Sequence, residues 1–277
     1  MTRRSPKPHQ TVVSKDGTRI AYDVQGNGPP LVIVNGALSV RTFTFAQKMA
    51  DGLAPHFTVY NYDRRGRGDS TDTPPYSVQR EVEDLAALCQ AAGGKPYVFG
   101  QSSGASLALE AAAAGVPMAG LVAYEPPYTQ ADPADKTDAQ GFEPTLKAHI
   151  ARGERDEAVA YFMRTVGVPG FVVRIMRLLP MWKVMRGVAH TLPYDAAVMA
   201  GFKVPGQRLA RVRVPTVLAA GEKTTPSLKA AALAASRAVP GAQHRLVPRS
   251  NHGIKAAAIA PVLVEAFRAA PPMQATA

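Results

Sequence analysis

The sequence predicts an α/β fold in which a mostly parallel sheet is flanked by helices and interrupted by a helical insertion. Short apolar runs bounded by glycine and proline alternate with helix-prone stretches, which is the order of elements in a parallel sheet. The run at 29–37 is solidly apolar, as expected of a strand that is buried on both faces. With 277 residues, the chain is long enough to bury one large core without a disulfide or a structural metal.

The elements can be placed in order along the first half of the chain. The Asp16-Gly17 pair between two β-prone runs predicts a hairpin turn. Beyond it, solid apolar runs predict strands, and apolar residues at helical spacing predict helices. Strands are expected at 29–37, 57–63, 96–100 and 119–125, and helices at 78–92 and 104–115.

Residues 127–213 break this alternation, because they are helix-prone and contain no comparable strand. Further strands are expected at 214–221 and 243–248, and a last helix at 256–270. The chain therefore divides into a core, residues 1–126 and 214–277, and a helical insertion over the strand ends, residues 127–213, which we call the lid.

The composition excludes several classes of protein. Cys89 is the only cysteine, so neither an intramolecular disulfide nor a cysteine-based metal cluster can form. No apolar run approaches the roughly 18–20 residues of a membrane span. The basic start is not followed by the apolar stretch of a secretory signal, and no dinucleotide-binding or phosphate-binding loop is present. We expect a cytoplasmic protein that needs neither a cofactor nor a metal.

A G-x-S-x-G motif at residues 100–104 lies between an expected strand and an expected helix. In that position the glycines permit a sharp turn, which holds the hydroxyl group of Ser102 above the sheet. The motif alone is common, but its place between strand and helix makes it specific. A serine held in this way is a candidate nucleophile, provided that a neighbouring base removes its proton.

The chain resembles the α/β-hydrolase fold family from its first hairpin to its last helix. Asn35-Gly36-Ala37 resembles the family's oxyanion loop, and residues 62–70 (YDRRGRGDS) resemble a loop common in these hydrolases. Ser250-Asn251-His252-Gly253 resembles the loop that carries the family's late histidine. The arginines and aspartates of 62–70 are expected to pair locally.

The resemblance implies a role for each of four residues. Ser102 would be the nucleophile and His252, in the loop after the last strand, its general base. The backbone N–H groups of Ala37 and Ser103 would bind the negative charge that develops on the substrate oxygen.

The acidic member of the expected triad is where the sequence departs from the family. Thr224 occupies the position of the usual aspartate. Two glutamates could replace it: Glu125, at the end of the strand 119–125, and Glu222, two residues before the usual position. We favour Glu125, because some family members place their acid after that strand and the longer side chain of Glu extends its reach.

The lid is rich in methionine and aromatic residues, which suit an irregular apolar pocket. Met176, Met181 and Trp182 are the candidate pocket residues, because a Met-Trp pair would suit a flat aromatic acyl group. Packing within the lid is the alternative interpretation of each of them.

A serine, a histidine and a carboxylate together predict acyl transfer on an ester or thioester, through an acyl-enzyme on Ser102. The general character of the sequence is similar to that of natural-product enzymes. This similarity suggests transfer of an aromatic acyl group from a carrier protein, as in antibiotic biosynthesis. A simple esterase or thioesterase is one alternative. A catalytically silent protein that binds a small ligand is another.

Positive charge is concentrated in the second half of the chain, and this distribution predicts the kind of partner that the protein binds. All but three of the acidic residues precede residue 158, and residues 158–221 contain nine Lys and Arg against one acid, Asp195. No nucleic-acid-binding motif accompanies this charge, and a membrane is not expected. An acidic carrier protein that delivers the small acyl substrate to the lid fits best, and a solvated arginine surface is the alternative.

Overall fold

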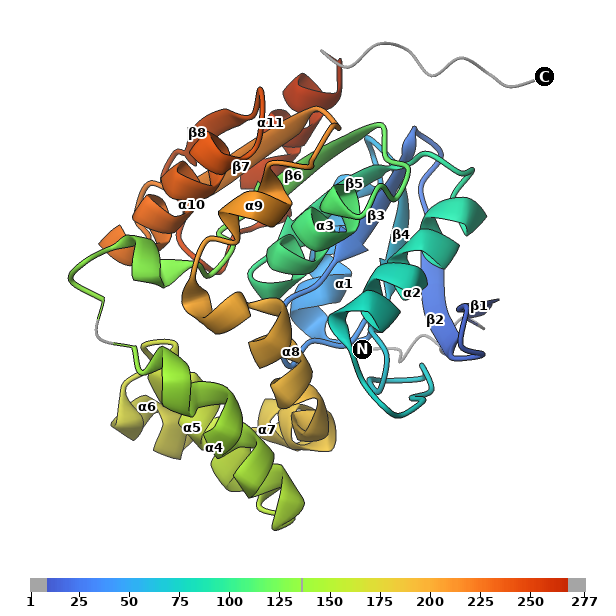
Figure 1. Cartoon of the computed structure of the whole chain (residues 1–277). Coiled ribbons are helices and arrows are strands. Elements are labelled where there is room, and N and C mark those ends of the chain that lie inside the picture. Colours follow the sequence, from blue (N-terminus) through green and yellow to red (C-terminus); the bar gives the residue numbers. More distant parts are fainter. Residues whose placement is uncertain (1–8, 136, 269–277) are drawn as a thin grey trace.

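The computed structural model describes residues 9–135 and 137–268, and its centre is a twisted eight-stranded sheet (Figure 1). β2 pairs antiparallel with β1 and β4, and every other pair of neighbours is parallel. The strand order is β1-β2-β4-β3-β5-β6-β7-β8. The strands are β1 (Gln10–Val13), β2 (Arg19–Gln25), β3 (Pro30–Val34), β4 (Thr58–Tyr62), β5 (Tyr97–Gln101), β6 (Gly120–Tyr124), β7 (Thr216–Gly221) and β8 (Gln243–Val247).

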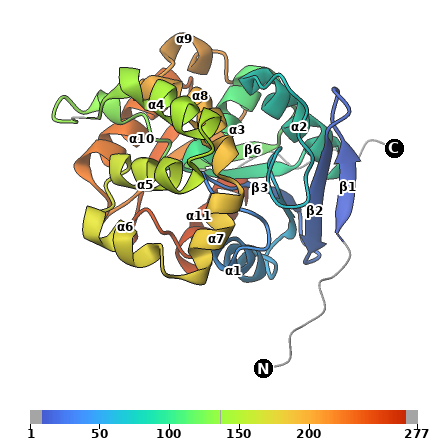
Figure 2. The same cartoon turned by 90° about the horizontal axis from the view of Figure 1, so that it is seen from below.

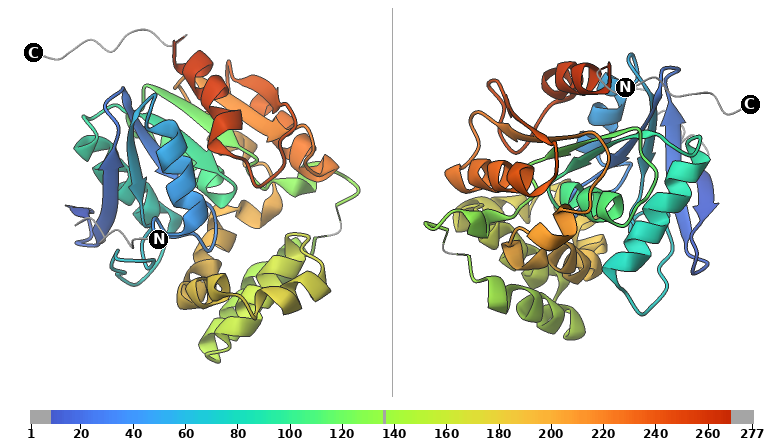
Figure 3. Two further views of the ribbon diagram at one scale, coloured as in Figure 1. Left: turned by 180° about the vertical axis from the view of Figure 1, so that it is seen from behind. Right: turned by 45° about the horizontal axis from the view of Figure 1, so that its top comes forward.

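Helices cover both faces of the sheet, which confirms the predicted fold class. One face carries α2 (Val78–Ala91), α3 (Ser103–Ala113), α9 (Gly206–Leu209) and α10 (Pro226–Ala238); the other carries α1 (Thr44–Leu53) and α11 (Ala256–Arg268) (Figures 1 and 3). Successive residues of a strand point to opposite faces. Val98 of β5 therefore lies in the core under α2 and α3, and Phe99 lies in the core under α1 and α11.

The sequence analysis did not predict two core helices, α10 and α1. Of these, α1 gives no start signal. It begins at Thr44 without a side-chain cap, so no capping signal precedes it. Ala46, Met49, Ala50 and Leu53 are nevertheless buried at the spacing of one helix face. Periodicity, rather than a start signal, would have revealed it.

The lid helices lie together beyond the edge of the sheet at which the parallel strands end (Figures 1 and 2). They share an apolar cluster that includes Phe142, Leu146, Val159, Trp182 and Met185. The helices are α4 (Ala139–Ala151), α5 (Arg155–Thr165), α6 (Gly170–Met176), α7 (Pro180–Gly187) and α8 (Leu192–Val198), joined by the short 3-10 helices η1 (Thr129–Ala131), η2 (Ala189–Thr191) and η3 (Ala200–Phe202).

The last part of residues 127–213 covers the sheet rather than the other lid helices. Leu209 of α9 and Val212 after it are buried with side chains of α3 and α10. No helix in the described part of the chain has the length and apolar character of a bilayer-spanning segment. Because parallel strands end at the same edge, the loops after β3, β5, β6, β7 and β8 meet there, and these loops carry the predicted site residues.

Candidate active site

Ser102 sits in a sharp turn between strand β5 and helix α3. Its backbone has φ 56° and ψ −130°, an unusual conformation for a residue with a side chain. Its N–H donates to the carbonyl oxygen of Tyr124 at 2.9 Å, and its own carbonyl oxygen accepts from Ala105 N at 2.8 Å. The turn is therefore fixed both to the neighbouring strand and to the helix that follows.

Three glycines allow the backbone to approach this turn closely. A Cβ on Gly104 would lie 2.1 Å from the carbonyl oxygen of Val34, and one on Gly100 would lie 2.6 Å from that of Gly104. A Cβ on Gly36 would lie 3.0 Å from Cβ of Ser102. Gly36 thus lets the loop after β3 pass beside the serine, which is where an oxyanion-binding loop must lie.

His252 is held by a buried carboxylate. Its Nδ1 lies 2.6 Å from Oε2 of Glu125, whose side chain is fully buried, while the imidazole is 47% exposed. Glu125 directly follows strand β6 and Ser102 directly follows β5, so neighbouring strand ends carry both residues. A histidine whose Nδ1–H is bound by a carboxylate presents Nε2 as the basic nitrogen.

Two further donors satisfy the Glu125 carboxylate. The N–H of Gly221 donates to Oε1 at 2.8 Å, and the hydroxyl group of Thr224 donates to Oε2 at 3.2 Å. Thr224, which stands at the family's usual acid position, is therefore a hydrogen-bond donor to the acid. Sequence reasoning did not find this role, because it depends on a contact between residues 99 positions apart.

Glu222, the other acid considered, makes a different contact. Its Oε2 accepts a hydrogen bond from the N–H of Arg249 at 2.9 Å, and its side chain is exposed. Of the two glutamates, Glu125 is the one that contacts His252. The acid role itself stays a prediction, which mutation can test.

The loop that carries His252 is fastened by the residues just before Ser102 and Glu125. Gln101 Nε2 donates to the carbonyl oxygen of His252 at 2.9 Å, and the hydroxyl of Tyr124 donates to that of Asn251 at 2.7 Å. Both contacts place the histidine against the ends of β5 and β6. Gln101 is the variable second position of G-x-S-x-G, so the motif gave no signal for this role.

The expected oxyanion-binding N–H groups are available. In residues 9–135 and 137–268, neither the amide of Ala37 nor that of Ser103 donates to another group. Ser103 is the first residue of α3, where the amides of the first turn have no partner within the helix. In the same part of the chain, Ser102 Oγ forms no hydrogen bond. The bond between a nucleophile and its base often forms only when substrate binds.

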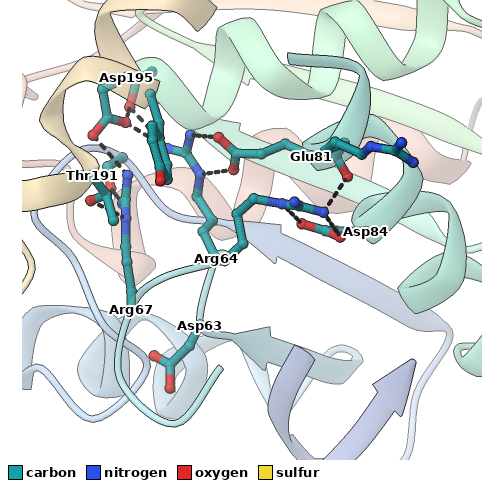
Figure 4. A network of polar contacts seen from close by, with 12 residues as sticks. Asp63, Arg64, Arg67, Glu81, Asp84, Thr191 and Asp195 are labelled. Carbon is teal, nitrogen blue, oxygen red and sulfur yellow. Dashed lines mark hydrogen bonds and ion pairs between the residues drawn. The ribbon is translucent and has the colours of Figure 1, made fainter. Parts of the chain in front are cut away.

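A buried ion network joins the loop after β4 to α2 and to α8 of the lid (Figure 4). Arg64 binds Glu81 of α2 and Asp195 of α8, each at 2.7 Å, and Arg67 binds Asp195 at 2.7 Å. The expectation that loop 62–70 pairs locally is thus wrong for all three of its arginines, since Arg65 binds Asp16 and Asp84. Their partners lie up to 131 residues away, beyond what local spacing can indicate.

This network touches both segments that carry the expected oxyanion donors. Arg67 Nη1 donates to the carbonyl oxygen of Gly36 at 2.8 Å, and the hydroxyl of Ser103 donates to Asp195 Oδ1 at 2.8 Å. Burial raises the pKa of Asp195, but the guanidinium groups of Arg67 and Arg64 outweigh that effect and hold the pKa below its usual value. Asp195 is therefore a charged residue of the lid beneath the site.

The candidate pocket residues lie within the lid cluster. Trp182 is buried, its Nε1 donates to Asp156 at 2.6 Å, and the guanidinium of Arg177 lies 5.5 Å from its ring centre. Met176 and Met181 are partly buried against the same cluster. Their role in a substrate pocket stays a prediction. The described residues contain no group of three or more side chains that could hold a metal ion.

Comparison with known proteins gives a consistent result. The sequence pattern of the Alpha/beta hydrolase family matches residues 31–266. The structure of an alpha/beta hydrolase from Sphaerobacter thermophilus is 46% identical, covers 93% of this chain and 100% of its own, and superposes with a TM-score of 0.84. The esterase RhEst1 from a Rhodococcus species has the same fold at 19% identity, over 95% of this chain and 99% of its own, with a TM-score of 0.66.

The curated relatives match over shorter stretches. N-formylmaleamate deformylase of Pseudomonas putida is 36% identical over 123 residues, which are 42% of this chain and 45% of the deformylase. The uncharacterized hydrolase YraK of Bacillus subtilis is 36% identical over 98 residues, 34% of this chain and 35% of that protein. The match therefore spans less than half the length of either relative.

Proposed function

The chain belongs to the alpha/beta hydrolase family, and we propose that it is a serine hydrolase that cleaves a carboxylic ester or a related acyl bond through an acyl-enzyme on Ser102. One observation carries the proposal. Glu125, which contacts His252 at 2.6 Å, and Ser102, which is held in a strained turn, follow neighbouring strands, and the N–H groups of Ala37 and Ser103 have no acceptor among the described residues. These are the nucleophile, base, orienting acid and oxyanion donors of acyl hydrolysis.

Each group has a defined step. Ser102 Oγ attacks the acyl carbon while its proton passes to Nε2 of His252, and the Glu125 carboxylate stabilises the imidazolium that forms. The N–H groups of Ala37 and Ser103 bind the oxyanion. The proton then passes to the leaving group. Water, deprotonated in turn by His252, attacks the Ser102 ester; the acyl–Oγ bond breaks, the proton passes from His252 to Ser102 Oγ, and the acid is released.

The relatives favour hydrolysis over the transfer expected from the sequence. Their names describe an esterase and a deformylase, and none of those quoted above is an acyltransferase. Transfer from a carrier protein to another acceptor stays a prediction without support from these proteins. If added alcohols, amines or thiols yielded acylated products in preference to the free acid, the assignment to hydrolysis would fail.

Substitution of the serine tests the proposed hydrolase. We expect wild-type protein to hydrolyse at least one member of a p-nitrophenyl ester series of increasing acyl length. Ser102→Ala should lower kcat by several decades, on the order of 10⁶-fold, as loss of a triad nucleophile does. Circular dichroism should show that the variant is folded. A folded variant that retained more than a few per cent of the activity would contradict an acyl-enzyme on Ser102.

A further inference from the structure

The lid exposes an unusual concentration of large apolar side chains. The described residues contain nine exposed large hydrophobic side chains, and six of them lie between residues 166 and 184. Leu178 is 85% exposed and Phe171 69%. We call this group the α6–α7 surface: Val166, Phe171, Ile175, Leu178, Leu179 and Val184. A monomeric protein surface usually shows such residues singly.

The pattern within α6 shows how the surface forms. Phe171, Ile175 and Leu178 follow one another at helical spacing on one side of α6 and the turn after it, while Val173 is buried in the lid cluster. The helix thus has apolar side chains on two sides, and the lid covers only one of them. Figures 1 and 2 both place α6 at the outer rim of the lid.

Cations are mixed into the same surface. Arg174 is exposed between Phe171 and Leu178, and Lys183 is exposed beside Val184. In the described chain neither has a carboxylate within ion-pair distance, whereas Arg177 and Arg186 are bound by Glu157 and Asp156 of α5. The unpaired positive charge therefore lies among the exposed apolar side chains.

We propose that the α6–α7 surface binds to an anionic lipid surface. Apolar side chains that protrude from a helix and its following turn can enter the headgroup region without a shape-matched groove. Arg174 and Lys183 would lie at the level of the lipid phosphates, where each cation adds to the attraction. An acidic carrier protein would neutralise the same two cations, but charge alone gives no reason for six exposed apolar residues around them.

Vesicle sedimentation of the full-length protein tests the proposal without reference to its activity. We expect the protein to sediment with phosphatidylcholine vesicles that contain about 30 mol% phosphatidylglycerol, and about tenfold less with pure phosphatidylcholine. Binding to the anionic vesicles should weaken at about 0.5 M salt, because screening shortens the reach of the cations. Equal binding to both vesicles, or to neither, would overturn the proposal.

Matched variants locate the binding surface. Phe171→Ser with Leu178→Ser should lower vesicle binding by about tenfold or more, whereas Val13→Ser with Leu246→Ser, two exposed apolar residues of β1 and β8, should leave it unchanged. Arg174→Glu with Lys183→Glu should likewise lower binding by about tenfold or more. Lys48→Glu with Lys95→Glu, which changes the net charge equally, should leave it unchanged. Equal losses in a test pair and its control would overturn the assignment to this surface.

Two rival occupants give distinct results. If a second copy covers the surface, sedimentation velocity will show a dimer that Phe171→Ser with Leu178→Ser converts to monomer. If an acidic protein covers it, an acyl carrier protein will bind wild type but not Arg174→Glu with Lys183→Glu, and vesicles will bind neither. Either result would overturn the lipid proposal. A monomer that binds anionic vesicles through this surface would support it.

Discussion

Glu125 illustrates how one residue's environment decides its role. It is fully buried, and three donors converge on its carboxylate, from Gly221, Thr224 and His252. Its φ is 50°, a conformation that costs free energy and persists only where the surroundings impose it. Leu38, Ser102 and Arg249, beside the other site segments, also have positive φ. Backbone strain thus gathers around the proposed site.

The role of Glu125 leads to a prediction about two conservative variants. Glu125→Gln should lower kcat/KM by up to about 10⁴-fold, because the amide cannot stabilise the imidazolium of His252. Glu222→Gln should change it by less than about threefold, since the hydrogen bond of the Glu222 side chain among the described residues is to the N–H of Arg249. Ester hydrolysis by both folded variants is the measurement. The reverse order would move the acid to Glu222, and full activity in both would indicate a Ser–His dyad.

The sequence could predict much of the site at this scale. The G-x-S-x-G motif and the late histidine loop indicated Ser102 and His252 as candidates, because both motifs are local in sequence. The choice between Glu125 and Glu222 could only be a preference, since it depends on which side chain reaches across to His252. Gln101 and Thr224 were missed because their contacts join residues 151 and 99 positions apart.

At the scale of elements, Asp195 joins α8 of the lid to the loops beneath the site. Replacing it with Asn would leave Arg67 buried without a matching charge and Arg64 with Glu81 as its remaining acidic partner. We expect Asp195→Asn to lower the free energy of unfolding by about 3 kcal/mol or more. Urea denaturation measures this change. The control is Glu265→Gln, which removes the exposed Arg245–Glu265 pair and should cost less than about 1 kcal/mol.

A small loss for Asp195→Asn, similar to that of the control, would mean that the buried network adds little to stability. A large loss of stability with normal kcat in the surviving folded fraction would separate two functions of the network. That result would mean that the network stabilises the fold but does not position Gly36 and Ser103 for catalysis.

The turn between β1 and β2 gives a pH-dependent prediction. Burial tends to raise the pKa of Asp16, but hydrogen bonds from Arg65 and Thr18 outweigh burial and lower the pKa from 3.8 to about 2. A depressed carboxyl pKa adds stability above the unfolded-state value and loses it as the pH falls towards the folded-state value. Solvent near this turn screens part of the charge interaction, so Asp16→Asn should cost about 1 kcal/mol at pH 7, and the difference from wild type should fall to about half by pH 3.

Urea denaturation of both proteins at several pH values between those limits provides the measurement. A difference that stayed constant with pH would show that the side chain acts through its shape and not through its charge. A difference that grew as the pH fell would contradict the direction given for the pKa of Asp16.

At the scale of the whole molecule, the order of strands and helices predicted the fold. The sequence did not predict which apolar side chains of the lid are exposed to solvent. Solid apolar runs predicted central strands such as β3, β6 and β7, because strands that are buried on both faces show no alternation of apolar and polar residues. In the lid, Val173 and Ile175 are equally apolar, yet one is buried and the other is exposed. The sequence alone suggested an acidic partner from charge. The exposed apolar side chains of the α6–α7 surface can be recognised only from the structure, because it shows which side chains the lid buries.

The central claim is that Ser102 is the nucleophile of a serine hydrolase, and covalent labelling tests it most directly. The native protein should react with a fluorophosphonate probe and gain the mass of one adduct, which tandem mass spectrometry of the digest should place on Ser102. His252→Ala should react far more slowly, because the hydroxyl group then lacks its base, and Ser102→Ala should not react. Native protein that remained unlabelled, or that carried the adduct on another residue, would contradict the account.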